Sequence, residues 1–326
     1  MKSKKTHPNY RVTILHLALI TFLQINLIAG ETEDSTRLIY KGPYTITVLT
    51  DRVYHIEDAN ESNPAGIHAG GMNNCSDMYL IVGQNKAMLI DLSNAIRWDS
   101  KAAESLRSIV YERTVDRELY ITITHNHSDH LGMLPAFIDD TKANFWLSEM
   151  EFKNIANRFP KERTVNFSEN TSFDLGGGFV INTIEVPGHT AHSTLFFLKD
   201  KNLVFSGDAI GSGSGIWLFN NDSFFAYIKG IENLIKYIEA PSNNIDTKKL
   251  VIHGGHAWQK GELEKLTSQY IYDMKTLIEK IGQGNAETTR STSSMSFLDT
   301  NFKYGTATIT WNREAADKYA ESLRSK

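Results

Sequence analysis

The sequence predicts an α/β protein in which β-sheets are covered by helices, with a site built at one edge from loops that follow strands. Short apolar segments bounded by turn residues alternate with longer segments of helical periodicity. His and Asp residues come directly after several of the apolar segments. Each half of the chain also contains a hairpin that ends in an aspartate, Asp91 in one half and Asp208 in the other. This repetition indicates a duplicated αββα arrangement.

The pattern of apolar residues places the individual elements along the chain. The predicted strands occupy residues 44–48, 53–56, 78–82, 87–90, 119–124, 179–186, 194–198, 203–206 and 250–252. The predicted helices occupy residues 100–112, 224–239, 262–281 and 315–323. Asp99 is the expected cap of the first helix, and Asp222 with Ser223 caps the second.

The first 30 residues have the composition of a secretory signal. Basic residues at positions 2, 4, 5 and 11 precede an apolar run over residues 12–28, and small residues follow at Ala29 and Gly30. The run is short for a membrane span, which leaves an uncleaved anchor as the alternative. We predict a signal peptide at residues 1–30, one catalytic domain at residues 31–326, and a secreted or periplasmic product without stable membrane insertion.

Charge and cysteine content narrow the class of partner. Removal of residues 1–30 takes away four positive charges and no negative ones, so the formal net charge moves from −4 to −8. An acidic chain without basic runs is a poor candidate for nucleic-acid binding, and we expect a small-molecule substrate instead. Cys75 is the only cysteine, so no internal disulfide forms, and we interpret it as a packed thiol. The oligomeric state stays open.

The central motif is the segment Thr-His-Asn-His-Ser-Asp-His at residues 124–130. His125 and His127 are two residues apart at the end of a strand, so both rings can point to the same side. Asp129 and His130 begin the next element and reach a second point nearby. Three imidazoles and a carboxylate so close together are typical of a zinc site.

This motif resembles the signature of the metallo-β-lactamase-fold superfamily, and four further motifs follow the order of that family. They are Leu-Ile-Asp at residues 89–91, Pro-Gly-His-Thr at 187–190, Ser-Gly-Asp at 206–208 and Gly-Gly-His at 254–256. The resemblance covers about residues 40–260. It implies a four-layer αββα sandwich of two mixed sheets flanked by helices.

The resemblance also implies a ligand set for two Zn²⁺ ions per chain. One zinc would be held by His125, His127 and His189, the other by Asp129, His130 and His256, with Asp208 bridging both. Asp91 would orient a ligand and sharpen its basicity. His253 is a rival to His256, although the Gly-Gly-His spacing favours His256. His192 stands where the family usually has a small residue, so we interpret it as part of the pocket wall.

Two zinc ions about 3.5–4 Å apart can share a hydroxide and lower its pKa to about 7 or below. That hydroxide is the expected nucleophile, and Asp129 is the expected catalytic residue that holds and delivers a proton. The bridging Asp208 resembles the glyoxalase II, lactonase and phosphodiesterase branches, because the best-known zinc β-lactamases carry a cysteine there. The Gly- and Ser-containing segment over residues 208–215 lacks the Lys-Ser/Thr of a phosphate loop, so we interpret it as a mobile loop.

Two segments are expected to form the rim of the site, residues 57–74 and 211–225. Within the second, Trp217 and Phe219 lie in loop sequence and are candidate substrate contacts, as is Trp258 beyond His256. Core packing is the alternative for each of these aromatic side chains.

The sequence therefore predicts an exported dinuclear zinc hydrolase that cleaves an ester, thioester, lactone, β-lactam or phosphodiester bond. One alternative is a mononuclear iron enzyme of the persulfide-dioxygenase kind, which uses similar motifs but mainly the first metal site. The other is a non-catalytic member of the same fold. Because degenerate members lose ligands and this chain keeps the full set, the hydrolase is favoured.

Overall fold

The N-terminal half of the fold is an eight-stranded sheet whose strands lie side by side in chain order. A computed structural model describes residues 38–58, 76–260, 263 and 265–325. The strands are β1 (Leu38–Lys41), β2 (Tyr44–Thr50), β3 (Val53–Asp58), β4 (Asp77–Val82), β5 (Lys86–Ile90), β6 (Glu118–Thr122), β7 (Ala143–Ser148) and β8 (Thr164–Phe167). Strands β1 to β5 pair antiparallel, and β5 to β8 pair parallel.

A second sheet of six strands follows in the order β15-β14-β12-β11-β10-β9. Its strands are β9 (Ser172–Asp174), β10 (Val180–Glu185), β11 (Thr194–Leu198), β12 (Leu203–Gly207), β14 (Val251–Gly254) and β15 (Leu266–Thr267). The β12 and β14 pair is parallel, whereas the other neighbours in this sheet are antiparallel.

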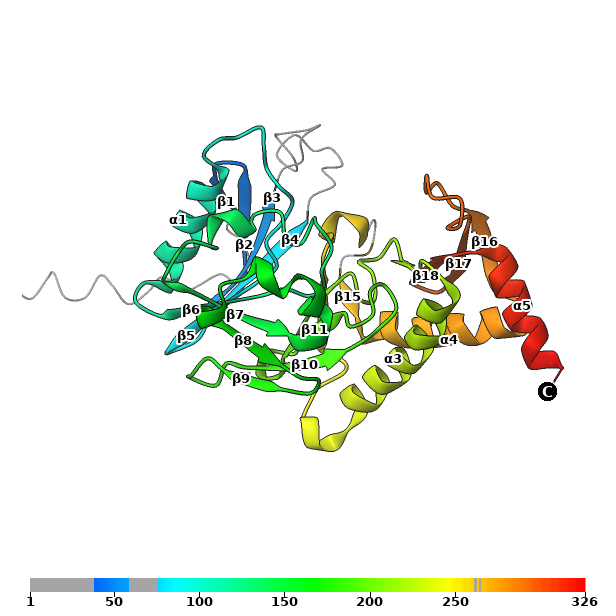
Figure 1. Cartoon of the computed structure of the whole chain (residues 1–326). Coiled ribbons are helices and arrows are strands. Elements are labelled where there is room, and N and C mark those ends of the chain that lie inside the picture. The colour runs from blue at the N-terminus through cyan, green and yellow to red at the C-terminus, as the bar shows by residue number, and fades with distance from the viewer. Residues whose placement is uncertain (1–37, 59–75, 261–262, 264, 326) are drawn as a thin grey trace, which may run out of the picture. The chain divides into compact units, whose positions relative to one another are not determined.

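Helices cover the outer faces of the two sheets, as Figure 1 shows for α1 and α3. The helices are α1 (Ala102–Thr114), α2 (Glu149–Phe152), α3 (Asn221–Glu239), α4 (Ser268–Gln283) and α5 (Arg313–Arg324). None of the helices in the described part of the chain is long and apolar enough to cross a membrane.

Three layers of apolar side chains hold these elements together. Strand β4 illustrates the arrangement, because all six of its residues are buried. Its Leu80 packs in the cluster that joins the first sheet to α1, while Ile81 packs in the cluster between the two sheets. Neighbouring residues of a strand point to opposite faces, so a strand covered on both faces has no polar side. A third cluster joins the second sheet to α3 and α4. The layering is the predicted αββα sandwich.

A third sheet of four strands is the main feature that the sequence did not predict. It has the order β13-β18-β17-β16, with β13 (Ile216–Trp217), β16 (Glu287–Arg290), β17 (Thr300–Tyr304) and β18 (Ala307–Trp311). All four residues of β16 are exposed, so the strand lacks the apolar alternation by which strands are recognised. At the inner side of this sheet, Trp311 stacks on Phe224 of α3 at 4.0 Å between ring centroids.

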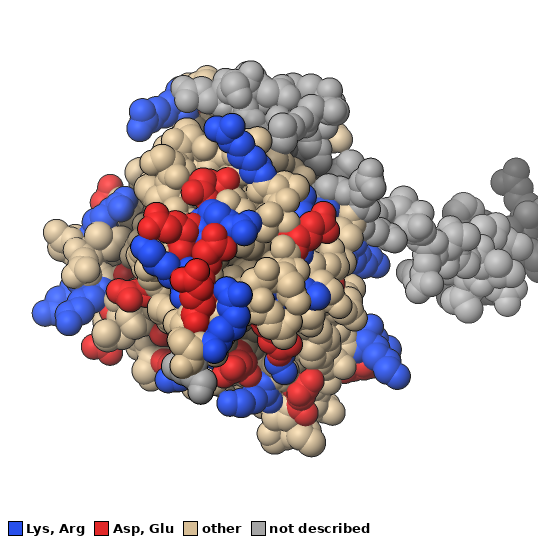
Figure 2. All heavy atoms as spheres, turned by 90° about the vertical axis from the view of Figure 1, so that its right-hand side faces the viewer, with Lys and Arg blue, Asp and Glu red and all other residues tan. Residues whose placement is uncertain are grey.

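The surface beside this third sheet carries charges of both signs. Figure 2 shows acidic and basic side chains interspersed on the face that it presents, without one sign gathering there. On α5 the charges form pairs one helical turn apart, Arg313 with Asp317 and Lys318 with Glu314. Such exposed pairs contribute little to stability.

Several predicted boundaries need correction. The helix predicted from residue 262 begins at Ser268, because Leu266 and Thr267 form β15 against β14 and the Thr267 side chain caps the helix. Helix α3 is capped by Asn220 rather than by Asp222 or Ser223. No side-chain cap forms at α1, although the Asp99 carboxylate accepts the Lys101 N–H. The predicted signal peptide, Cys75 and most of the predicted first rim segment lie outside the described residues.

Candidate metal centre

Strand direction brings the predicted ligands to one edge of the fold. In the first sheet β5 and β6 are parallel, so the loops that carry Asp91 and His125 leave the sheet on the same side. In the second sheet β10 and β12 are both antiparallel to β11, and β14 is parallel to β12. The loops after these three strands therefore also leave on one side, and they carry His189, Asp208 and His256.

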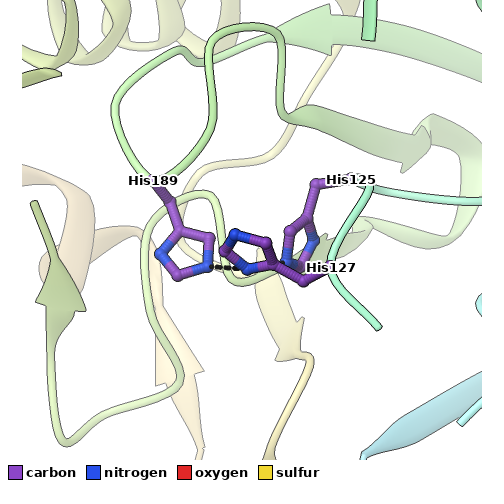
Figure 3. Close-up of side chains that lie close together, drawn as sticks. All are labelled: His125, His127 and His189. Atoms are coloured by element: carbon purple, nitrogen blue, oxygen red, sulfur yellow. Dashed lines mark hydrogen bonds between the residues drawn. The ribbon is translucent and has the colours of Figure 1, made fainter. Parts of the chain in front are cut away.

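Three histidines form the first group of candidate ligands (Figure 3). His125 and His127 come from the loop after β6, and His189 reaches them from the loop after β10. The Nδ1 atom of His127 lies 3.1 Å from Nε2 of His125 and 3.0 Å from Nε2 of His189. One nitrogen from each ring thus converges on one point, as a metal ion requires.

The His125 and His189 rings each also make a hydrogen bond on the side away from His127, and this bond determines which ring nitrogen carries the proton and which keeps a lone pair. His189 Nδ1 lies 3.2 Å from the Trp217 carbonyl oxygen, which only accepts, so Nδ1 carries the proton. Thr124 Oγ1 donates to Asp91 Oδ2 at 2.9 Å and accepts from His125 Nδ1 at 3.0 Å. The Nε2 lone pairs of both rings therefore face His127, whose Nδ1 carries one proton at most. A cation among these nitrogens relieves their repulsion, so the set fits a metal.

The second group consists of Asp129, His130, Asp208 and His256. His256 Nε2 lies 3.4 Å from Asp129 Oδ2 and 3.3 Å from Asp208 Oδ2. The same Asp208 oxygen is 3.7 Å from His130 Nε2 and 3.6 Å from His189 Nε2 of the first group. Asp208 is thus a carboxylate that lies against both groups, where the resemblance places the bridging ligand.

Two buried atoms of this second group lack a hydrogen-bond partner among the described residues. They are His130 Nε2 and Asp208 Oδ1. A buried polar atom without a partner costs about 1–3 kcal/mol, more when the group is charged. A divalent cation would satisfy both atoms, and a mixture of imidazole and carboxylate suits zinc. The residues present therefore fit two metal ions, each bound by three or four side chains.

Asp91 is the hydrogen-bonding centre behind both groups. Its Oδ1 accepts the backbone N–H of Thr124 at 2.7 Å, and its Oδ2 lies 2.9 Å from His130 Nδ1. The carboxylate thereby turns Nε2 of His130 toward Asp208. Asp91 itself has a φ of 62°, a left-handed conformation that an L residue adopts at some cost. The geometry agrees with the predicted orienting role.

The pKa values of the metal-free site follow from burial and from its two carboxylates. Burial lowers the pKa of His125 well below its usual range and that of His189 to about 4. Burial also opposes charge on His130, but Asp91 and Asp208 outweigh it and raise the pKa of His130 to about 10. Burial works against ionised Asp129, yet His256 and His130 lower its pKa to about 2. The first group is thus neutral, and the second holds a proton where a cation would bind.

Glu151 joins the loops that carry the three histidines, and sequence reasoning missed it. This buried residue of α2 accepts the Asn126 N–H on Oε1 at 2.9 Å and the His192 N–H on Oε2 at 3.0 Å. One carboxylate therefore holds the His125–His127 loop against the His189 loop. No motif marks Glu151, and only its position after an apolar strand could have suggested a role.

Strand β4 fixes the loop that carries His256. The Tyr79 hydroxyl donates to the Gly254 carbonyl at 2.7 Å, and the Asp77 N–H donates to the Gly255 carbonyl at 2.8 Å. The Asp77 carboxylate also accepts the Ala257 N–H. Gly255 is required here, since a Cβ atom would lie 2.4 Å from Asp208 Oδ1 and 2.6 Å from His130 Cε1. The Gly-Gly of the motif therefore permits close approach of the backbone to the site.

A cavity of about 410 Å³ opens beside both groups. Trp217 and Phe219 line it, as predicted. Trp258 does not line it, and Gln259 lies there instead, because the turn over Ala257–Lys260 directs neighbouring side chains to different sides. Met295 is a lining residue that the sequence did not single out.

Two other histidines lie apart from the candidate ligands. His253 packs between the sheets, where it stacks on Phe205 at 5.7 Å between ring centroids and lies against Tyr79. The His192 ring pairs with Glu185 at 2.9 Å and does not line the cavity, contrary to the prediction that it forms part of the wall. Its N–H is held by Glu151, so the loop around it points away from the cavity.

Curated relatives of this chain are distant in sequence. The lactamase-like protein nscB of Trichophyton equinum is 27% identical over 156 residues, which are 47% of this chain and 42% of the relative. The metallo-beta-lactamase fold-containing protein ST1585 of Sulfurisphaera tokodaii is 23% identical over 208 residues, 55% of this chain and 72% of that protein. The chain thus spans less than half the length of the first of these relatives.

Solved structures share the fold at low sequence identity. A metallo-beta-lactamase from Erythrobacter litoralis superposes with a TM-score of 0.53 at 16% identity and covers 75% of this chain and 100% of its own. The DIM-1 metallo-beta-lactamase gives the same TM-score at 13% identity, over 74% of this chain and 99% of its own. These similarities establish the fold.

The metallo-beta-lactamase superfamily model matches residues 76–268, and this range includes every candidate ligand described above. The two His and Asp clusters are typical of that fold. Since the match covers more than half of the sequence, the chain belongs to the metallo-beta-lactamase superfamily.

Proposed function

We propose that this protein is a dinuclear zinc hydrolase that cleaves an ester, thioester, lactone, β-lactam or phosphodiester bond of a small molecule. The observation that carries the proposal is the complete set of seven His and Asp side chains in two groups beside a cavity. His125, His127 and His189 would hold one zinc, and Asp129, His130 and His256 the other, with Asp208 shared.

The bound metals would supply a water of lowered pKa and polarise the oxygen of the scissile bond. The chain itself positions the donors through Asp91, Glu151 and the backbone of Trp217. Asp129 is the residue suited to move a proton, because its half-buried carboxylate lines the cavity within reach of His256. It would accept a proton from the attacking water and return it to the leaving atom.

A substrate screen with the zinc-loaded chain tests this proposal. The panel contains lactones, thioesters, esters, β-lactams and phosphodiesters, and Asp208→Ala serves as the control for contaminating activity. We expect hydrolysis of at least one class that chelation abolishes and zinc restores. Zinc-loaded protein without hydrolysis of any class would refute the proposal.

We also propose export, from the basic, apolar and small-residue order of residues 1–30. The mature chain would begin near Glu31 and carry a net charge that disfavours nucleic acid. N-terminal sequencing of the protein from the native cell tests this, since an intact N-terminus in the membrane fraction would contradict cleavage.

A further inference from the structure

The cavity beside the candidate ligands is lined by side chains of two kinds. One set consists of His and Asp side chains. The other set, here called the apolar wall, consists of Ile216, Trp217, Phe219 and Met295, with Gln259 as its uncharged polar member. The volume of about 410 Å³ is that of a site for a small molecule. A substrate that reaches the ligand groups through this cavity can therefore place its remaining part against the apolar wall.

The apolar wall is attached directly to the histidine group. The Trp217 carbonyl accepts the Nδ1–H of His189, so the residue that lines the cavity also orients a candidate ligand. The Phe219 ring lies 5.4 Å from the ring of His189 and 6.0 Å from that of His127, between centroids. The wall thus keeps a fixed distance from the reacting end of a bound substrate.

The unpredicted third sheet supports this wall. Strand β13 pairs in parallel with β18, with Trp217 opposite Thr310, and the Leu218 N–H donates to the Thr310 carbonyl at 3.1 Å. Met295 comes from the segment between β16 and β17. Strands β16, β17 and β18 lie beyond residue 268, where the superfamily match ends, whereas Trp217 and Phe219 lie within the matched range. The C-terminal strands therefore add Met295 to the apolar wall and support Trp217 through β18.

No Lys or Arg lines the cavity within the part of the chain that the structure describes. Residues 59–75, which precede β4, contain neither Lys nor Arg in the sequence. A carboxylate or phosphate at the far end of a substrate would lose water against Trp217 and Phe219 without gaining a cationic partner. Burial of an unpaired charge is strongly unfavourable, whereas burial of an alkyl or aryl group is favourable in proportion to its area.

We propose that this site, if it is the hydrolytic site proposed above, takes substrates whose part distal to the scissile bond is an uncharged alkyl or aryl group. The third sheet selects this class, because its strand β13 carries Trp217 and the segment between β16 and β17 carries Met295. Substrates with a distal anion, and phosphodiesters with charged substituents on both sides, are disfavoured.

A matched pair of ligands tests the proposal without catalysis. N-methylhexanamide and the monomethylamide of adipic acid share the same head group and differ in a distal methyl or carboxylate. Calorimetry with the metal-free full-length chain should show at least about ten-fold tighter binding of the neutral amide, the effect of one unpaired charge. Equal or tighter binding of the anionic amide would overturn the proposal.

A variant with an added charge tests whether the lining of the cavity causes the preference for the neutral ligand. Gln259→Lys places a cation in the cavity and should raise the relative affinity for the carboxylate ligand by about ten-fold. Gln283→Lys adds the same charge at an exposed position at the end of α4 and should leave the preference unchanged. An unchanged preference in Gln259→Lys, or an equal change in Gln283→Lys, would show that the cavity is not the binding site.

Hydrolysis separates this inference from the proposed function. The zinc-loaded chain should hydrolyse p-nitrophenyl hexanoate with a kcat/KM at least about ten-fold above that for mono-p-nitrophenyl adipate. Hydrolysis with the reverse preference overturns the inference and leaves the hydrolase intact. If the chain hydrolyses neither ester but still binds the neutral amide more tightly, the proposed hydrolase function is wrong. The proposed ligand preference then remains supported.

Discussion

Asp208 is the residue that lies against both groups of candidate ligands. Its carboxylate is within 3.7 Å of His130, His189 and His256, and its Oδ1 is buried without a partner among the described residues. A carboxylate in this place offsets the repulsion between two divalent cations, in a site where water screens them poorly. Under the proposed function, Asp208 would therefore determine whether the site holds one metal or two.

The Asp208→Ala variant should lose one of its two zinc ions or bind it more weakly, because the remaining donors leave two close cations without a shared anion. We expect turnover to fall by about 100-fold or more, since even groups that only orient a ligand contribute about 10- to 100-fold. The pH optimum should rise, because the attacking water loses its second cation. Metal content and the pH–rate profile are measured together. Two retained zincs with an unchanged profile would exclude Asp208 as the bridge.

His253 in β14 and His256 in the loop that follows form a matched pair three residues apart. His256 lies in the second group of ligands, whereas His253 packs on Phe205 between the sheets. His256→Ala should reduce zinc affinity at one site by at least about ten-fold, and His253→Ala should retain both metals. Zinc titration of the two variants checks this. The opposite ranking would assign the last ligand to His253.

His253 also makes the stability of the metal-free chain depend on pH. Burial, together with the nearby cationic groups His55, Lys260 and Lys265, lowers the pKa of His253 to about 3 from an ordinary value of 6.5. As the pH falls, His253 is therefore protonated in the unfolded chain at a higher pH than in the folded chain. The contribution of His253 is present above pH 6.5 and is lost as the pH falls toward 3, by about 1 kcal/mol per pH unit.

His253→Leu should remove this dependence. Between pH 6.5 and 4.5 the free energy of unfolding should fall less steeply with acid in the variant than in the parent. Urea unfolding of both chains at a series of pH values provides the comparison. If the free energies of unfolding of the two chains change in parallel with pH, the pKa of His253 is not lowered in the folded state.

At the scale of elements, the site depends on contacts between loops that are distant in the sequence. Glu151 of α2 holds the loops after β6 and β10 together, and Asp77 with Tyr79 of β4 holds the loop after β14. These contacts fix the backbone from which the candidate ligands project. Because they bond to backbone groups, they leave no motif by which the sequence could reveal them.

Glu151→Gln should loosen the three-histidine group. The substitution keeps the shape of the side chain but replaces one acceptor by an NH₂ group that faces a backbone N–H. We expect zinc affinity at this group to fall by about 10- to 100-fold with little change in secondary structure. Glu149→Gln, an exposed change on the same helix, is the control and should have no effect. Equal zinc affinities in the two variants would remove the positioning role of Glu151.

The sequence predicted the elements whose pattern is apolar and whose ends carry His or Asp. Strand β12 before Asp208 and β14 before His256 are examples, since a buried strand must be apolar and a ligand must be His or Asp. The sequence did not predict β16, whose residues are all exposed, or the place of Met295, which depends on packing across the third sheet. It assigned Trp258 to the wall where Gln259 lies, because one residue of a turn reverses the direction of a side chain.

At the scale of the whole molecule, three apolar layers hold the strands rigidly enough for a preorganised site. The described chain buries Asp91, His125 and His130 almost completely, and such polar groups are tolerated when they are bonded to each other or to a metal. Metal binding should therefore contribute to stability as well as to chemistry, since a ligand that binds only the folded state stabilises it by mass action. Removal of metal should lower Tm without unfolding the core.

The count of metal ions per chain tests the central claim most directly. Elemental analysis of the purified protein after equilibration with zinc should give two zinc ions per chain, and chelation should abolish hydrolysis until zinc is restored. We expect this stoichiometry because seven side chains converge in two groups and Asp208 lies against both. One tightly bound iron per chain, with oxygen consumption in place of hydrolysis, would contradict the account.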